Sequence, residues 1–150
     1  MFFRQFVHES LGHASYLVGS DETGDALVLD VRRDVDGYFD AARAEGLRIR
    51  WAADTHQHND YASGICELPA RADVQLLAGA RAELGYPVRA MADGERLELG
   101  EVVVELVETP GHTPEHVSFL LTDRSRGSAP SVLLSGGAPQ VGDVARPDLL

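Results

Sequence analysis

Runs of apolar side chains divide this chain into short strands separated by polar turns. The nearly continuous apolar run Ala26–Val31 is typical of a strand that is buried on both faces. Glu101–Thr109 alternates apolar and polar side chains and gives the clearest strand pattern in the chain. The pattern predicts strands at Phe2–Val7, Ser15–Val18, Ala26–Val31, Arg48–Ala53, Val74–Ala78, Glu101–Thr109, Val117–Leu121 and Ser131–Ser135.

A helix is predicted between the third and fourth of these strands. Asp36 is a suitable cap for a helix that runs through Glu45, and Gly46 stops it. Strand, helix and strand in close succession form a βαβ unit, so Ala26–Val31 and Arg48–Ala53 are expected to be parallel neighbours. A second, short helix is predicted near Ala62–Ala72. The fold class that follows is α/β (α+β), rich in strands.

The length of 150 residues predicts one domain, because a chain of this size buries roughly 68–70% of its unfolded surface. Asp123–Pro130 is polar and marks a surface turn, whereas Gly136–Leu150 has no periodicity. A domain whose last segment lacks structure is unusual. We therefore expect residues 1–150 to be a single domain that is incomplete at its C-terminus.

The composition excludes several classes of partner. Asp and Glu number 24 against 13 basic residues, all of them Arg, and the net charge of −11 disfavours nucleic acid. No apolar run is long enough to span a membrane, and the N-terminus lacks the apolar stretch of a signal peptide. The single cysteine, Cys66, forms no internal disulfide and is interpreted as a small buried side chain. These features favour a cytoplasmic protein.

Chemistry-bearing side chains gather directly after the predicted strand Arg48–Ala53. In extended backbone, residues two apart point to the same side, so His56, His58 and Asp60 present two imidazoles and a carboxylate to one region. This donor set suits zinc, iron or manganese. The alternative is a pair of exposed loop histidines beside an aspartate that caps a helix.

A second histidine lies in a tight turn after the strand Glu101–Thr109. The turn Thr109–Pro114 has the sequence TPGHTP, with His112 held between two prolines beside a glycine. A rigid turn fixes a side chain at low entropic cost, which a metal ligand needs. A histidine in such a turn is otherwise usually a surface residue.

Together, H-x-H-x-D and the PGHT turn resemble the motifs of the metallo-β-lactamase superfamily. The resemblance implies a metallo-β-lactamase-like αββα sandwich, of which this chain carries the N-terminal portion. Thr109–Phe119 and Val141–Leu149 resemble the persulfide dioxygenase and glyoxalase II branch. That branch implies a hydrolase or sulfur dioxygenase acting on a small glutathione-type thiol derivative. In bacteria it also implies a rhodanese-type sulfurtransferase partner or fusion.

By the same resemblance, Fe(II) or Zn(II) is held at His56, His58, Asp60 and His112. His56 and His112 are the principal ligands and His58 is an auxiliary ligand. Asp60 is the candidate catalytic carboxylate, which orients the site. Of the other histidines, His8 and His13 are interpreted as surface or packing residues. His116 is either an exposed residue at the start of a strand or a contact for a substrate carboxylate.

Three departures from the family pattern bear on function. Tyr61 stands where the family has a histidine, and Gly137 stands where it has a metal-bridging aspartate. The family's second half is also absent, which predicts that one face of the first sheet is exposed and that homo-oligomers form. The alternative hypotheses are therefore a degenerate, non-catalytic metallo-β-lactamase-fold module and a fragment that needs a partner.

Overall fold

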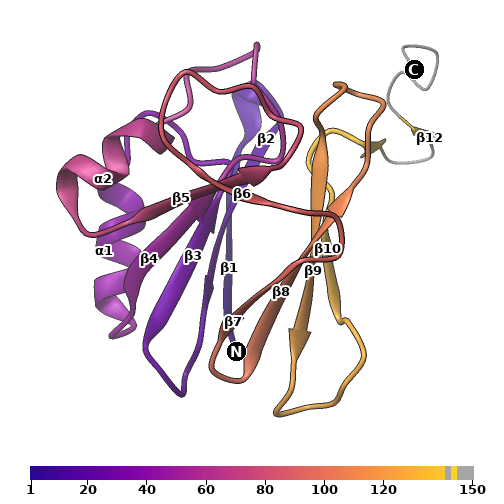
Figure 1. Cartoon of the computed structure of the whole chain (residues 1–150). Coiled ribbons are helices and arrows are strands. Elements are labelled where there is room, and N and C mark those ends of the chain that lie inside the picture. The colour runs from indigo at the N-terminus through magenta and orange to yellow at the C-terminus, as the bar shows by residue number, and fades with distance from the viewer. Residues whose placement is uncertain (141–142, 145–150) are drawn as a thin grey trace.

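A six-stranded sheet is the centre of the computed structural model, which describes residues 1–140 and 143–144 (Figure 1). Its strand order is β1-β2-β3-β4-β5-β6. The strands are β1 Phe2–His8, β2 His13–Gly19, β3 Asp25–Leu29, β4 Arg48–Ala53, β5 Gln75–Gly79 and β6 Arg89–Met91. The pairs β1–β2 and β2–β3 are antiparallel, whereas β3–β4, β4–β5 and β5–β6 are parallel. The predicted βαβ unit is therefore confirmed.

Short helices connect these strands. The α-helices are α1 Asp36–Ala44 and α2 Leu68–Arg71, and the 3₁₀ turns are η1 Glu9–Leu11 and η2 Ile65–Glu67. α1 buries Tyr38, Ala41 and Ala42. It begins at the predicted residue, but Val35 is the N-cap and no side chain caps the helix. The predicted helix at Ala62–Ala72 is shorter than expected, since η2 and α2 begin only at Ile65.

The second sheet is antiparallel, with four strands in the order β10-β9-β8-β7. Its strands are β7 Arg96–Leu99, β8 Val102–Glu108, β9 Val117–Asp123 and β10 Val132–Leu134. β11 Pro139–Gln140 and β12 Asp143–Val144 form a separate antiparallel pair. That pair corrects the expectation that Gly136–Leu150 has no structure. Residues 141–142 and 145–150, and with them most of the Val141–Leu149 stretch, lie outside the described residues.

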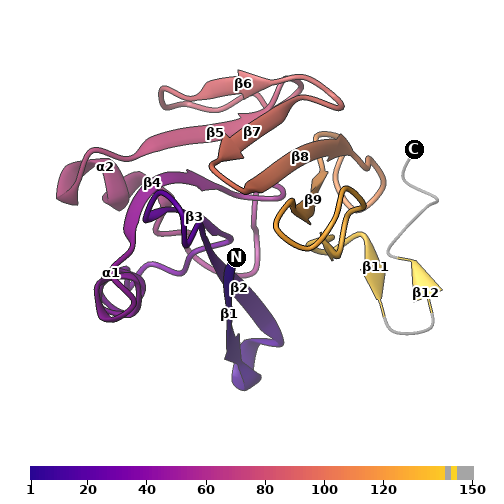
Figure 2. The same ribbon diagram turned by 90° about the horizontal axis from the view of Figure 1, so that it is seen from below.

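Two hydrophobic cores separate three layers (Figure 2). One core fills the space between α1, α2 and the first sheet, with Leu17, Val28 and Tyr38 among its buried members. The other lies between the two sheets and includes Leu106 and Phe119. Both faces of the first sheet are thus covered, so the prediction of an exposed face on that sheet was wrong. Among the described residues, the sheet face that no other layer covers is the outer face of the second sheet.

The strands β6 and β7 were not predicted. β6 has three residues and β7 has four, and such short segments carry too few positions for an alternating pattern to be recognised. Among the described residues, no helix is long and apolar enough to cross a membrane. Cys66 is exposed, which corrects its interpretation as a buried side chain.

Candidate metal centre

The carboxyl ends of β3 and β4 bring the motif residues to one edge of the first sheet. Because these strands are parallel neighbours, Asp30, which follows β3, lies beside Thr55, which follows β4. The turn after β8 carries His112 to the same edge. It is closed by a hydrogen bond from the backbone N–H of Thr109 to the carbonyl of His116, at 2.9 Å.

Three of the four predicted metal-binding side chains converge. The ring centres of His56 and His58 are 4.1 Å apart, and those of His56 and His112 are 4.6 Å apart. All three line a cleft of about 290 Å³ that also includes Gly137. Asp60 does not join them closely. Its side chain is 61% exposed, and its Oδ1 atom lies 3.9 Å from His58 Nδ1.

The imidazole of His56 is held with one nitrogen free. Its Nδ1 atom shares a hydrogen bond of 2.9 Å with the hydroxyl of Thr55, which leaves Nε2 for another ligand. Burial, together with the neighbouring His58, lowers the pKa of His56 to about 4. At neutral pH the ring is therefore uncharged, which is the form that binds metal.

Asp30 orients His58, and the sequence reasoning missed it. Its carboxylate accepts hydrogen bonds from the Thr55 backbone N–H at 2.7 Å, from the Thr55 hydroxyl at 3.1 Å and from His58 Nε2 at 3.1 Å. His58 Nδ1 is then free for a metal, an arrangement in which a carboxylate supports a metal-binding histidine. Burial lowers the pKa of His58, but the hydrogen bond and charge of Asp30 outweigh burial and raise it.

The backbone of Asp30 supports this role. It has a φ of +53°, the only positive φ among the described non-glycine residues, and Asp tolerates that conformation better than most side chains. An aspartate at the end of the apolar run before a helix was the signal available in the sequence. The role of Asp30 follows only when β3 and β4 are known to end side by side.

Asp54 lies behind this arrangement. Within the described part of the chain, one group of three or more His, Cys, Asp and Glu residues has its ligand atoms within 4.8 Å of one another. It consists of Asp30, Asp54 and His58. Since the oxygens of Asp30 already accept three hydrogen bonds, we interpret this trio as support for His58 rather than as a coordination site. Asp54 accepts a hydrogen bond from the Ser63 hydroxyl at 2.8 Å, and burial raises its pKa to about 7.

Two further histidines are buried, and for one of them this contradicts the expectation. His13, interpreted as a surface or packing residue, is 8% exposed and lines the same cleft. His116 is 1% exposed, so the interpretation as an exposed residue at the start of a strand was wrong. Its Nδ1 atom is 2.8 Å from the Thr109 hydroxyl, and its ring stacks on His56 at 5.1 Å.

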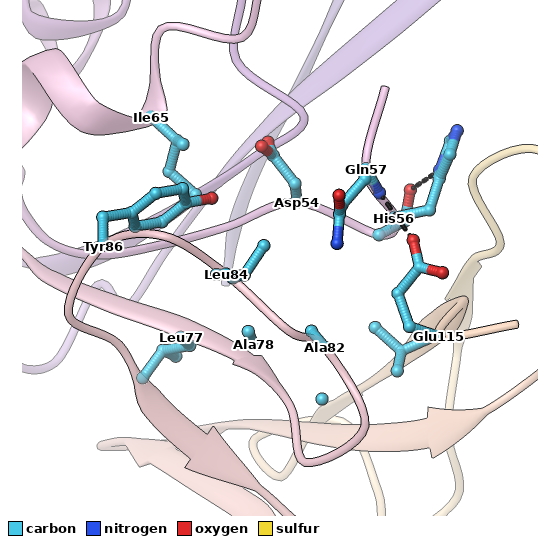
Figure 3. A pocket seen from close by; sticks show the side chains of 13 residues that line it. Asp54, His56, Gln57, Ile65, Leu77, Ala78, Ala82, Leu84, Tyr86 and Glu115 are labelled. Carbon is cyan, nitrogen blue, oxygen red and sulfur yellow. Dashed lines mark hydrogen bonds between the residues drawn. The ribbon is translucent and has the colours of Figure 1, made fainter. Parts of the chain in front are cut away.

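A smaller pocket lies on the other side of the segment that carries His56 (Figure 3). It has a volume of about 40 Å³ and is mostly apolar, with Leu77, Leu84 and Tyr86 in its lining. The His56 ring points away from the middle of this pocket, while Glu115 accepts a hydrogen bond from the Gln57 backbone at 2.9 Å. The histidine cleft and this pocket are therefore separate.

No protein-family model matches this chain. It is 35% identical over 92 residues to a hydroxyacylglutathione hydrolase of Acidiphilium cryptum, across 60% of this chain and 38% of that protein. It is 30% identical over 129 residues to the mitochondrial persulfide dioxygenase ETHE1 of Homo sapiens, across 82% of this chain and 49% of that protein. Its fold matches the crystal structure of a metallo-β-lactamase from Staphylococcus aureus subsp. aureus COL with a TM-score of 0.91 and 38% identity, over 99% of this chain and 47% of that chain.

This chain belongs to the metallo-β-lactamase superfamily. Its relatives lie in the glyoxalase II and persulfide dioxygenase branch, as the resemblance of Thr109–Phe119 and Val141–Leu149 to that branch predicted. The chain spans less than half the length of each of these three proteins. The three layers described above are the N-terminal portion of the metallo-β-lactamase sandwich.

Two positions distinguish this metallo-β-lactamase-fold chain from the family pattern. The hydroxyl of Tyr61 donates a hydrogen bond to the Asp30 carbonyl at 3.2 Å, and burial raises the Tyr61 pKa, so the phenol stays neutral. A Cβ atom at Gly137 would lie 2.8 Å from His112 Nε2, so the His112 ring rests directly on the Gly137 backbone.

The donor set of the cleft fits one of the two metals that the family implies better than the other. Three imidazoles fit a single zinc ion. In His56 and in His58, one ring nitrogen is held by a hydrogen bond and the second ring nitrogen is free. An iron centre with two histidines and a carboxylate fits less well. Among the described residues that line the cleft, Asp30 is engaged by its three donors and Asp60 is largely exposed.

Proposed function

We propose that this chain is a metal-dependent protein that acts on a small thiol derivative, as hydroxyacylglutathione hydrolase-like proteins do. His56, His58 and His112 hold one zinc ion, and Asp60 orients the group that reacts beside it. The observation that supports this proposal is the convergence of three imidazoles on one cleft, with Nε2 of His56 and Nδ1 of His58 left free.

A zinc ion bound there supplies a Lewis acid that polarises a thioester carbonyl and lowers the pKa of a bound water. The chain's own residues hold that site in position. Asp30 fixes the tautomer of His58 by accepting from its Nε2 atom. The carboxylate of Asp60, at the open rim of the cleft, is placed to accept a proton from a water molecule.

The sulfur dioxygenase activity with Fe(II) is the finer alternative within the same branch. The identity to a persulfide dioxygenase favours it, and it requires Asp60 to turn inward as the carboxylate ligand. A non-catalytic module is the second candidate function, favoured by Gly137, which offers no side chain to a metal. A rhodanese-type partner and a cytoplasmic location remain predictions.

Metal titration of the purified 150-residue chain tests the proposal. We expect the wild type to bind close to one equivalent of zinc. His112→Ala removes a ligand and should weaken zinc binding by at least about 100-fold, while Asp30→Asn removes only the support of His58 and should weaken it by about 10–100-fold. His8→Ala is the matched control, because His8 is only half-buried and is not in the lining of the cleft, and among the described residues its side chain bonds to Ser10.

Competition with a chromophoric chelator gives each zinc affinity, and elemental analysis gives the stoichiometry. Zinc well below one equivalent, or equal affinities for wild type and His112→Ala, would favour the non-catalytic module. Iron bound in preference to zinc under anaerobic conditions, followed by persulfide-dependent oxygen uptake, would move the assignment to the dioxygenase.

A further inference from the structure

His13 is a buried imidazole whose ring nitrogens form no hydrogen bond to any described residue. It is the first residue of β2, directly after Gly12, whose φ of +59° turns the chain back from η1. The side chain points inward, and the residue is 8% exposed. Neither Nδ1 nor Nε2 has a hydrogen-bond partner among the described residues, and both atoms are shielded from solvent. A buried polar group left in this way is unfavourable unless a ligand satisfies it.

The neighbouring polar groups are already engaged. Tyr61 packs against His13, with ring centres 4.2 Å apart, but its hydroxyl donates to the Asp30 carbonyl. The carboxylate of Asp30 accepts from Thr55 and His58. Within the described part of the chain, both ring nitrogens of His13 are therefore unengaged, and the other free nitrogen beside it is His58 Nδ1, which the proposed function assigns to the metal.

The position of His13 relates it to the metal centre. Its ring centre is 6.2 Å from that of His58, and both residues line the cleft that contains His56 and His112. The three proposed ligands thus lie toward one part of the cleft and His13 lies beyond His58. A ligand of a few bonds' length can reach from the metal position to His13 within the cleft's volume of about 290 Å³.

We propose that His13 binds the carboxylate of a small thiol acid whose sulfur lies at the His56, His58 and His112 cluster. The proposal rests on the proposed function, because it takes the metal position from that site. Thiolate sulfur is a suitable ligand for zinc, and an N–H group binds an anionic oxygen more strongly than a neutral one. The main competing charge is the buried carboxylate of Asp30, which already accepts hydrogen bonds from Thr55 and His58, whereas the largely exposed carboxylate of Asp60 is screened by water.

A pair of thiols that differ in one group tests the assignment. The Co(II)-loaded chain is titrated with 3-mercaptopropionate and with 1-propanethiol, and the thiolate-to-cobalt absorption band reports sulfur binding directly. We expect the wild type to bind mercaptopropionate about tenfold or more tightly than propanethiol, the size expected for a hydrogen bond to a charged group.

His13→Phe keeps a ring against Tyr61 but removes both nitrogens, and should make the two thiols bind equally. His13→Asn retains a donor and should recover part of the preference. His8→Phe, on the same hairpin but half-buried and outside the lining of the cleft, should retain all of it. If His13→Phe does not fold, ¹⁵N-labelled histidine in the wild type gives the second measurement, because bound mercaptopropionate should shift the His13 ring nitrogens and propanethiol should not.

The possible failures are distinguishable. An unchanged preference in His13→Phe, with the absorption band present, overturns the role of His13 and leaves the metal centre intact. The same conclusion follows if mercaptopropionate leaves the His13 nitrogens unshifted. A shift of those nitrogens on adding zinc alone would make His13 a metal ligand and also overturn the carboxylate assignment. If neither thiol produces the band, the proposed function fails together with this inference.

Discussion

Asp30 and Asp54 are two buried carboxylates whose surroundings set opposite roles. Asp30 accepts three hydrogen bonds and holds His58. Asp54 accepts one, from Ser63, and its buried Oδ1 atom has no partner in the part of the chain that the structure describes. Burial, reinforced by the nearby charge of Asp30, therefore favours the protonated form of Asp54 and raises its pKa from 3.8 to about 7.

This difference predicts a pH-dependent stability in the metal-free chain. Between about pH 4 and pH 7 the folded chain keeps a proton on Asp54 that the unfolded chain has lost, so this residue's contribution to stability falls as the pH rises through that range. Asp54→Asn removes the dependence. The melting temperature of the variant minus that of the wild type should rise from about pH 4 to about pH 7 and stay constant above it.

Thermal unfolding at a series of pH values checks this prediction. Taking the difference between variant and wild type removes the contributions of the other titrating groups, including His56. Asp40→Asn is the control, since the Asp40 side chain is 71% exposed and pairs with Arg43 at the surface. A difference that does not change with pH would show that Asp54 is ionised in the folded chain throughout.

At the residue scale the sequence predicted the convergence of the proposed metal ligands better than it predicted the residues that support them. The spacing of His56 and His58 and the rigid turn at His112 are local features, and these side chains do converge. Asp30 and His13 come from β3 and β2, and only the pairing of the strands places them beside the motif. Asp60 lines the same cleft, but its side chain is largely exposed, because the backbone after Ala53 is not a strand and the alternation of sides in extended backbone does not apply there.

At the scale of elements, two glycines differ in how closely other residues pack against them. Gly64 lies next to the isolated bridge between Arg32 and Ser63, and a Cβ atom there would be 2.3 Å from the Arg32 carbonyl oxygen. Gly37 lies in α1 with no atom within 4 Å of its Cβ position. The first glycine is required by packing and the second is not.

Opposite effects on stability follow for the two alanine variants. Gly64→Ala should lower the free energy of unfolding by about 1–3 kcal/mol, because backbone atoms must move to admit the methyl group. Gly37→Ala should raise it by up to about 1 kcal/mol, since alanine loses less conformational freedom in a helix. Urea denaturation measures both. A Gly64→Ala chain as stable as the wild type would show that the Arg32 segment moves freely.

The longer strands were predictable because each is a run of five or more residues with a clear pattern. The prediction of β3 and β4 as parallel neighbours was confirmed for a physical reason, since a crossover of this length containing one helix joins parallel strands. β6 and β7 are set by tertiary pairing with β5 and β8 rather than by their own pattern. Local sequence therefore does not identify them.

At the scale of the whole molecule, the two cores share the first sheet. Alternate residues of β3 face opposite layers, with Val28 in the helical core and Leu27 in the core between the sheets. The outer face of the second sheet carries ion pairs instead, Arg96 with Glu105 and Arg124 with Glu98. The homo-oligomer that was expected from an exposed first sheet thereby loses its physical basis and stays a prediction.

Because one sheet serves both cores, we expect the chain to unfold as a single unit. Leu106 is fully buried between the sheets, and Leu106→Ala should lower the free energy of unfolding by about 2–5 kcal/mol. Trp51 fluorescence reports on β4, while far-ultraviolet circular dichroism reports on all elements. Denaturation curves from the two signals should coincide in wild type and variant. Two separate transitions in either protein would contradict a shared core.

The contact between Gly137 and His112 limits what can replace this glycine. With the His112 ring resting on the Gly137 backbone, an aspartate at position 137 would place a Cβ atom within 2.7 Å of that ring. The ring must turn aside before any larger side chain fits. A substitution that supplies a carboxylate at this position therefore also moves His112, so the two positions cannot be altered independently.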